Sequence, residues 1–222
     1  IIEYIHEHRG EGCTAQAMNY AAKAGHLEVV EWLHHNRSEG CTIHAMDFAA
    51  RHGHLHVIDW LHRTRSEGCT HWAMDYAARE GYLDVVVWLH EHRLEGCTTY
   101  AMDVAADKAK FDVVEWLHAN RTEGCTTRAM DYAAGNGHLE IVEWLHNNRN
   151  EGCTIHAMDY AASNNHLETL AWLYEHRHEG CSPWAVNAAL QHGHHDVARW
   201  LQTHHPYNAF GRRICVPTCT II

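Results

Sequence analysis

The sequence predicts an all-α fold, a solenoid built from repeated helix-turn-helix units. Cysteine recurs every 28 residues from Cys13 to Cys181, and tryptophan does so from Trp32 to Trp200. Between these columns, apolar residues return at helical spacing on each side of a glycine-containing turn. One copy buries too few apolar side chains to offset the entropy of ordering it, so neighbouring copies must share one continuous core.

The repeat also sets the domain organisation. Residues 1–10 fit the second half of one further copy, so we expect the chain to be a segment of a longer protein. The solenoid is predicted to cover residues 1–205. Residues 206–222 leave the pattern and form a divergent tail, which either caps the last helix or hangs loose. Seven full copies begin at Glu11, Glu39, Glu67, Glu95, Glu123, Glu151 and Glu179.

The first helix of each copy, here called helix A, is predicted to start after an N-cap threonine such as Thr14. At 100° per residue, the inward side carries small residues and methionine, and the other side carries polar ones. In the first copy the inward set is Ala17, Met18, Ala21 and Ala22, and the outward set is Gln16, Asn19, Tyr20 and Lys23.

The turn after helix A is predicted to use a left-handed residue. Gly25 stands at the position of a left-handed C-terminal cap, and Asn165 is the usual substitute for glycine there. Ala109 breaks this column. We therefore expect a differently terminated helix at Ala109 and the least stable joint of the array.

The second helix of each copy, helix B, is predicted over residues 26–36 of the first copy. Its inward face would carry Val29, Val30, Trp32 and Leu33. Glu28 near its start and His34 near its end match the sign of the helix dipole.

Composition excludes several classes of function. The formal charge of -11, with 17 basic against 28 acidic residues, argues against nucleic-acid binding. No apolar run is long enough to cross a membrane, and no charged-then-apolar leader is present. The repeated cysteines would lie in successive layers about 8–10 Å apart, too far for disulfides, so we expect reduced thiols and a cytoplasmic or nuclear location. Because we expect further residues before residue 1, secretion into a host cell is a second possibility.

The segment from Ala21 to Leu33, AAKAGHLEVVEWL, resembles the second two-thirds of an ankyrin repeat. Residues 16–19 read QAMN where ankyrin repeats carry Thr-Pro-Leu-His, and the copy is shorter than the family's usual ~33 residues. The missing residues correspond to the β-hairpin finger. Shortened ankyrin-like arrays of oomycete proteins, some of them of the secreted-effector type, are similar in their WLH, EGCT and AMD motifs.

The resemblance implies a scaffold that binds a partner protein or peptide through a concave face made by helix A and short loops. We expect a monomer with no cofactor. The columns that vary between copies are the candidates for contact, with Trp72, Tyr100 and Trp184 as aromatic anchors. The alternative interpretation is that these columns vary without functional consequence, because they lie on a solvent-exposed face. The candidate partner-binding residues are Gln16, His44, Trp72, Tyr100, Arg128, His156, Trp184, Lys23, Arg51, Arg79 and Asp107.

An acidic column on helix A has three interpretations. Its side chains could pair with the arginine column that includes Arg37, bond the loop N–H groups of the next copy, or line an acidic groove for a basic peptide. The column, here called the aspartate ladder, is Asp47, Asp75, Asp103, Asp131 and Asp159, with Asn19 and Asn187 at its ends.

The 25 histidines raise a metal-binding or acid-responsive alternative. Most of them occupy two recurrent places, the turn after helix A, as at His26, and the end of helix B, as at His34. There we expect hydrogen bonds within turns and contacts with the helix dipole. No metal-binding motif of paired ligands is present, and a Cys-His pair repeated in every copy indicates packing, so we expect no catalysis. A spacer or spring within a larger protein is the remaining alternative.

Overall fold

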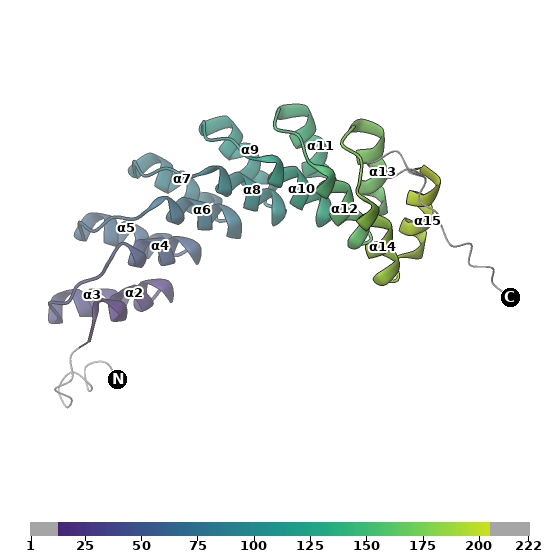
Figure 1. The fold of residues 1–222 in the computed structure, drawn as a ribbon. Helices are drawn as coiled ribbons and strands as arrows, with labels where there is room; N and C mark the ends of the chain where they lie inside the picture. Colours follow the sequence, from purple (N-terminus) through teal and green to yellow (C-terminus); the bar gives the residue numbers. More distant parts are fainter. Residues whose placement is uncertain (1–12, 205–222) are drawn as a thin grey trace. The chain divides into compact units, whose positions relative to one another are not determined.

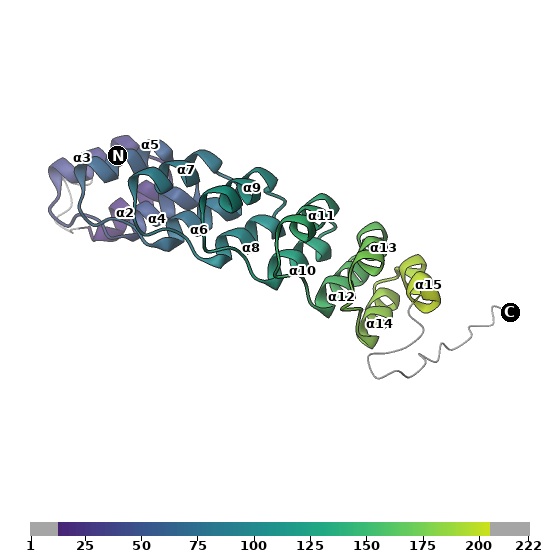
Figure 2. The same cartoon turned by 90° about the horizontal axis from the view of Figure 1, so that it is seen from above.

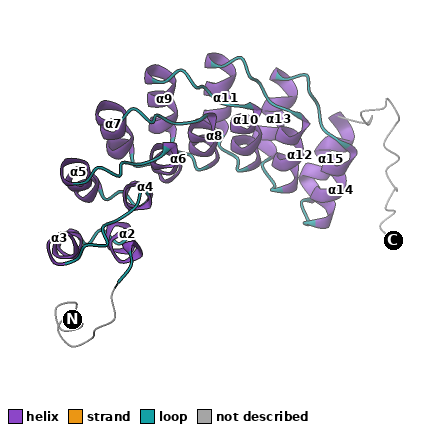
Figure 3. Ribbon diagram, turned by 60° about the vertical axis from the view of Figure 1, so that its left-hand side comes forward, coloured by secondary structure: helices purple, strands orange, loops and turns teal. Residues whose placement is uncertain are grey.

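A computed structural model describes residues 13–204, in which there are fourteen helices and no strand (Figures 1 and 3). The predicted half repeat at 1–10 and the divergent tail at 206–222 lie outside these residues. The chain divides into two compact units after Ala101. Each is treated separately below.

The first unit contains three complete helix pairs. Helix A is α2 (Ala15–Lys23), α4 (His44–Arg51) and α6 (His71–Glu80), and helix B is α3 (Leu27–Asn36), α5 (Leu55–Thr64) and α7 (Leu83–His92). The boundary between the units falls inside α8 (Thr99–Asp107).

The second unit continues the same order. After α9 (Phe111–Asn120), its helices are α10 (Thr127–Gly135), α11 (Leu139–Asn148), α12 (Ile155–Ser163), α13 (Leu167–His176), α14 (Pro183–Gln191) and α15 (His195–His204).

Each unit has two layers of helices. In the first unit α2, α4 and α6 pack side by side, and each packs against the helix B that follows it (Figures 1 and 2). In the second unit α10, α12 and α14 form the same layer. Residues 37–43 join α3 to α4 without a strand, so the absence of the hairpin finger is confirmed in this connection. The predicted all-α repeat fold is confirmed.

The predicted caps start most helices of the first layer. The hydroxyl of Thr70 accepts a hydrogen bond from the backbone N–H of Trp72 at 3.1 Å, and its own backbone is extended. Thr126, Thr154 and Ser182 do the same for later copies. These oxygens satisfy N–H groups that a helix start leaves without an intrahelical partner.

The inward face of helix A is largely as predicted, with one correction. Met18, Ala21 and Ala22 are buried. Asn19 was expected to face outward, and this prediction was wrong, because its side chain is fully buried. Its amide donates to the hydroxyl of Thr42 at 2.9 Å, so the next copy supplies the hydrogen-bond partner that makes burial of a polar group acceptable.

Helix B contributes aliphatic residues to the core, while its tryptophans lie at the margin. Val30 and Leu33 are buried, but Trp32 is only half-buried. In later copies the indole meets the edge of a histidine from the preceding copy, as in His62 and Trp88, whose ring centroids lie 5.2 Å apart. The expectation that tryptophan fills the shared interior is corrected accordingly.

The turn after helix A has the predicted left-handed backbone. Gly25 has φ +74°, and Asn165 has φ +67°. Ala109 also adopts φ +55°, so the prediction of a differently terminated helix there was wrong. The N–H of Lys110 still donates to the carbonyl of Ala105 at 2.8 Å, the bond that closes this turn in the other copies. These bonds and the packing hold alanine in a conformation that costs an L-residue roughly 1–2 kcal/mol.

Candidate protein-interaction surface

The aspartate ladder is buried and joins successive copies. Asp131 accepts the backbone N–H of Thr154 at 2.7 Å and its hydroxyl at 2.8 Å. Because Thr154 is itself the N-cap of α12, each carboxylate completes the start of the next helix A. The same pair of bonds occurs at Asp47, Asp75, Asp103 and Asp159.

This geometry decides between the three interpretations of the ladder. Bonding to loop N–H groups of the next copy is confirmed. The acidic-groove interpretation was wrong, because the ladder aspartates are no more than 4% exposed. Burial raises the pKa of Asp47, Asp103 and Asp131, although the hydrogen bonds from threonine oppose that rise.

The arginine column pairs with glutamate instead of with the aspartate ladder. Arg65 forms an ion pair with Glu67 and donates a second bond from Nε to Oε2 at 3.2 Å. It also donates from Nη1 to Nδ1 of His34 in the preceding copy at 3.3 Å. The hydrogen bond from Arg65 holds the pKa of Glu67 below its usual range. The arginines therefore tie together the loops between copies.

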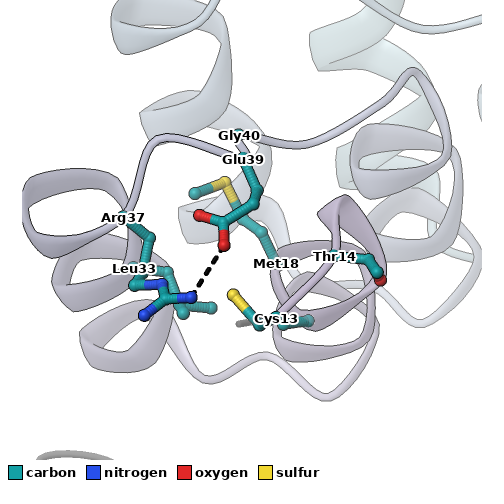
Figure 4. Close-up of a pocket in the computed structure, with 8 residues that line it drawn as sticks. Cys13, Thr14, Met18, Leu33, Arg37, Glu39 and Gly40 are labelled. Carbon is teal, nitrogen blue, oxygen red and sulfur yellow. Dashed lines mark hydrogen bonds and ion pairs between the residues drawn. The ribbon is translucent and has the colours of Figure 1, made fainter. Parts of the chain in front are cut away.

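A shallow recess lies beside three of these ion pairs. Figure 4 shows the first, where Arg37 and Glu39 meet at 2.7 Å next to Cys13, Met18 and Leu33. The space leaves no room for a water molecule, whereas ligand pockets begin at about 300 Å³. The recess is a packing joint that recurs around Cys41 and Cys69.

The outward side of helix A in the first unit carries an aromatic cluster. Trp72 and Tyr100 are 39% and 36% exposed, and their rings meet edge to face with centroids 5.7 Å apart. Trp72 also stacks on Tyr76 at 5.0 Å. The guanidinium carbon of Arg51 lies 5.0 Å from the centre of the Tyr76 ring. Both predicted anchors of this unit therefore belong to one cluster, which joins three successive copies.

Sequence reasoning missed two members of this surface. Tyr76 supports Trp72, and Phe48 stacks on the candidate residue His44 with centroids 5.5 Å apart. Each lies four positions after a candidate on the same helix, and that spacing places two side chains on one face. This four-residue spacing could therefore have identified both residues from the sequence.

The remaining candidates of the first unit lie on the same side of helix A. Gln16 and Lys23 are exposed, and Arg51 and Arg79 are half-exposed. Lys23, Arg51 and Arg79 occupy one position in three successive copies.

The candidates of the second unit are also accessible, but they are less clustered. Arg128 is exposed, and Trp184 is 46% exposed. His156 stacks on Tyr160 at 5.3 Å. Asp107 differs from the others, because its carboxylate accepts the side-chain N–H of Asn136 at 2.7 Å and so takes part in the joint between copies.

Two family models match the chain. Residues 18–62 and 74–146 match a model described as ankyrin repeats (many copies), and residues 132–213 match one described as ankyrin repeats (3 copies). The first match alone covers more than half of the chain. The chain belongs to the ankyrin repeat family.

Ankyrin repeats are generally protein–protein interaction modules. No curated protein matches this chain, so none supports the expected similarity to oomycete repeats. Between residues 13 and 204, none of the helices has the length and apolar character needed to cross a membrane.

Several histidines of these ankyrin repeats form hydrogen bonds between successive copies. Nε2 of His54 bonds the carbonyl oxygen of Lys23 at 3.1 Å, and His138 makes the corresponding bond to Asp107 at 3.2 Å. Histidines of this turn column thus form hydrogen bonds, as predicted, but their partners lie in the preceding copy and not within the same turn. Within residues 13–204, no group of three or more histidine, cysteine, aspartate or glutamate side chains is arranged to hold a metal ion.

We expect the stability of this ankyrin array to fall between about pH 7.5 and about pH 5.5. Burial lowers the pKa of His54 and His166 below the usual 6.5, and neighbouring histidines lower it further. The neutral rings therefore stabilise the folded chain above pH 6.5, and this contribution is lost as the pH falls through the lowered pKa. The buried aspartates act in the opposite direction, because a raised folded-state pKa makes protonation favour folding.

The measurement compares melting temperatures at the two pH values. The double variant His54→Tyr/His166→Tyr should show a smaller difference than the natural chain. Tyr82 already occupies the corresponding position in the third copy, where its ring covers Gly53 as His54 covers Gly25. An unchanged pH difference in the double variant would contradict the assignment.

Proposed function

We propose that this chain binds a partner protein or peptide through the outward surface of helix A, with the first unit contributing the main contacts. The observation that supports this is the cluster of Trp72, Tyr76 and Tyr100, in which Trp72 and Tyr100 are more than a third exposed. Large aromatic side chains contribute strongly when they are buried at an interface. In the free chain these rings are held by contacts with one another, so little conformational entropy would be lost on binding.

The double variant Trp72→Ala/Tyr100→Ala should weaken partner binding by roughly 2 kcal/mol or more, the range of interface hot spots. Its melting curve should stay close to that of the natural chain, because neither ring is part of the buried core. Binding is measured by crosslinking and affinity capture from lysate, followed by titration of the captured partner.

Tyr174→Ala is the matched control. Tyr174 is 38% exposed on helix B and meets Trp200 edge to face at 5.4 Å, so it resembles Trp72 in exposure and contact but lies in the other layer. Equal weakening by the control would contradict the helix A assignment. A large loss of helicity in the Trp72→Ala/Tyr100→Ala variant would show that these rings are structural.

We propose further that the chain is a monomer without enzymatic activity and without affinity for nucleic acid. Burial raises the pKa of the Cys69 and Cys125 thiols to about 12, so the nucleophilic thiolate is scarce. The net charge of -11 opposes binding to phosphate backbones. The seven cysteines between residues 13 and 204 are free and mostly buried, which suits a reducing compartment, in the cytoplasm or nucleus of the producing cell or, for a secreted effector, of a host.

The spacer and the metal-binding or acid-responsive module remain alternatives to this proposal. Absence of any partner that depends on Trp72 and Tyr100 would favour the spacer. Metal analysis of the dialysed protein would test the histidine-rich alternative.

A further inference from the structure

We propose that the helix A surface of the first unit takes an acidic linear peptide segment of its partner, with an apolar side chain between the carboxylates. This inference depends on the proposed function of that surface and specifies the chemistry of its ligand.

The first argument is that burial of the aspartate ladder leaves this face basic. Asp47 and Asp75 point inward and are no more than 3% exposed. The other carboxylate on α2, α4 and α6 is Glu80, which lies 3.5 Å from Arg79 in an ion pair. Lys23, Arg51 and Arg79 therefore make the surface positive although the whole chain carries a charge of -11. A negatively charged segment complements this local charge.

The second argument is the position of the basic residues beside the aromatic cluster. Arg51 lies over the ring of Tyr76, which stacks on Trp72, which in turn meets Tyr100. A carboxylate that reaches Arg51 thus lies within a side chain's length of an apolar platform. A ligand with an apolar residue between acidic ones would use both.

The third argument concerns spacing. Adjacent packed helices lie about 8–10 Å apart, and an extended peptide advances about 3.3 Å per residue. Acidic residues about three positions apart would therefore reach the same position in successive copies. In the second unit the corresponding residues are Asp107, Gly135 and Ser163, so that surface lacks this basic row.

The experiment selects a displayed library of random linear peptides on the full chain. We expect the enriched peptides to be acidic, with aspartate or glutamate about every third position around a leucine or an aromatic residue. Affinity of a labelled selected peptide should fall roughly tenfold in the variant Arg51→Gln/Arg79→Gln, since two exposed ion pairs are lost, and it should weaken as salt is raised.

The matched control is Arg63→Gln/Arg199→Gln. It removes the same charge from exposed positions on helix B, and Arg63 is paired with Asp59 at 2.9 Å much as Arg79 is paired with Glu80. Circular dichroism should show equal helicity in both variants. Equal loss of affinity in both would overturn the inference, because it would indicate attraction by overall charge alone.

The other outcomes separate the two proposals. Neutral or basic peptides whose binding is lost in Trp72→Ala/Tyr100→Ala would overturn the acidic ligand and leave the proposed function standing. Peptides that bind that variant normally would count against the helix A surface itself. A library that yields no binder above background would overturn the linear-peptide inference, while the capture experiment would still decide whether the surface binds a folded partner.

Discussion

Replacing Gly137 with alanine is expected to lower the free energy of unfolding by roughly 2–4 kcal/mol. The backbone at Gly137 has φ +74°, which an L-residue adopts only at a cost. An added Cβ would also overlap Nδ1 of His166, whose ring covers this turn from the next copy. Backbone strain and overlap therefore act together. Urea denaturation followed by circular dichroism measures the loss.

Gly193→Ala separates the two causes. Gly193 has φ +78°, but nothing lies within 4 Å of its added Cβ, so only the backbone cost of about 1 kcal/mol should appear. Ala109→Gly tests the reverse change, because it removes the strain of φ +55° and should stabilise the second unit slightly. If Gly193→Ala proved as harmful as Gly137→Ala, contact with the next copy would not be the reason for glycine in this turn.

Removing the carboxylate of Asp131 by substitution with alanine should cost roughly 2–4 kcal/mol in unfolding free energy. The change leaves both the backbone N–H and the hydroxyl of Thr154 without their acceptor, in a place where the carboxylate itself is only 3% exposed. Thermal and urea unfolding measure the effect.

The control is Asp131→Asn, for which the first copy provides a natural precedent. Asn19 occupies the same place, accepts the N–H of Thr42 at 3.0 Å and donates to its hydroxyl at 2.9 Å. Asparagine also avoids the cost of burying a charge, so we expect a loss below about 1 kcal/mol. Equal destabilisation by Asn and Ala would show that the charge, and not the hydrogen-bonding geometry, holds the copies together.

Much of the fold could be predicted because it depends on residues close together in sequence. The caps at Thr70 and Thr154 and the left-handed turn at Gly25 are set within a few residues of each helix end. The burial of the Asn19 side chain could not be predicted in the same way. Its hydrogen-bond partner lies 23 residues later, and helical periodicity alone assigns a polar side chain to solvent.

The candidate surface was only partly predictable for a related reason. Differences between copies drew attention to Trp72 and Tyr100, and the structure brings these two rings into contact. Tyr76 was passed over because its column is aromatic in most copies, although its place one turn beyond Trp72 could have revealed it. Alanine disfavours a left-handed backbone, yet Ala109 adopts one. The hydrogen bonds from the N–H groups of Ala109 and Lys110 to the end of α8 hold the backbone in this turn.

The ladder bonds give the array a direction. Each aspartate accepts hydrogen bonds from the N-cap residue 23 residues later, which begins the next helix A. Every such helix start therefore depends on the copy before it. During synthesis on the ribosome, each aspartate acceptor is made before the threonine or serine that donates to it. Each new copy can therefore fold against a copy that already carries its hydrogen-bond acceptor. Deleting the amino-terminal copy leaves the N–H and hydroxyl donors of the next copy without their aspartate acceptor. Deleting the carboxy-terminal copy removes the donors and leaves only an aspartate carboxylate without them.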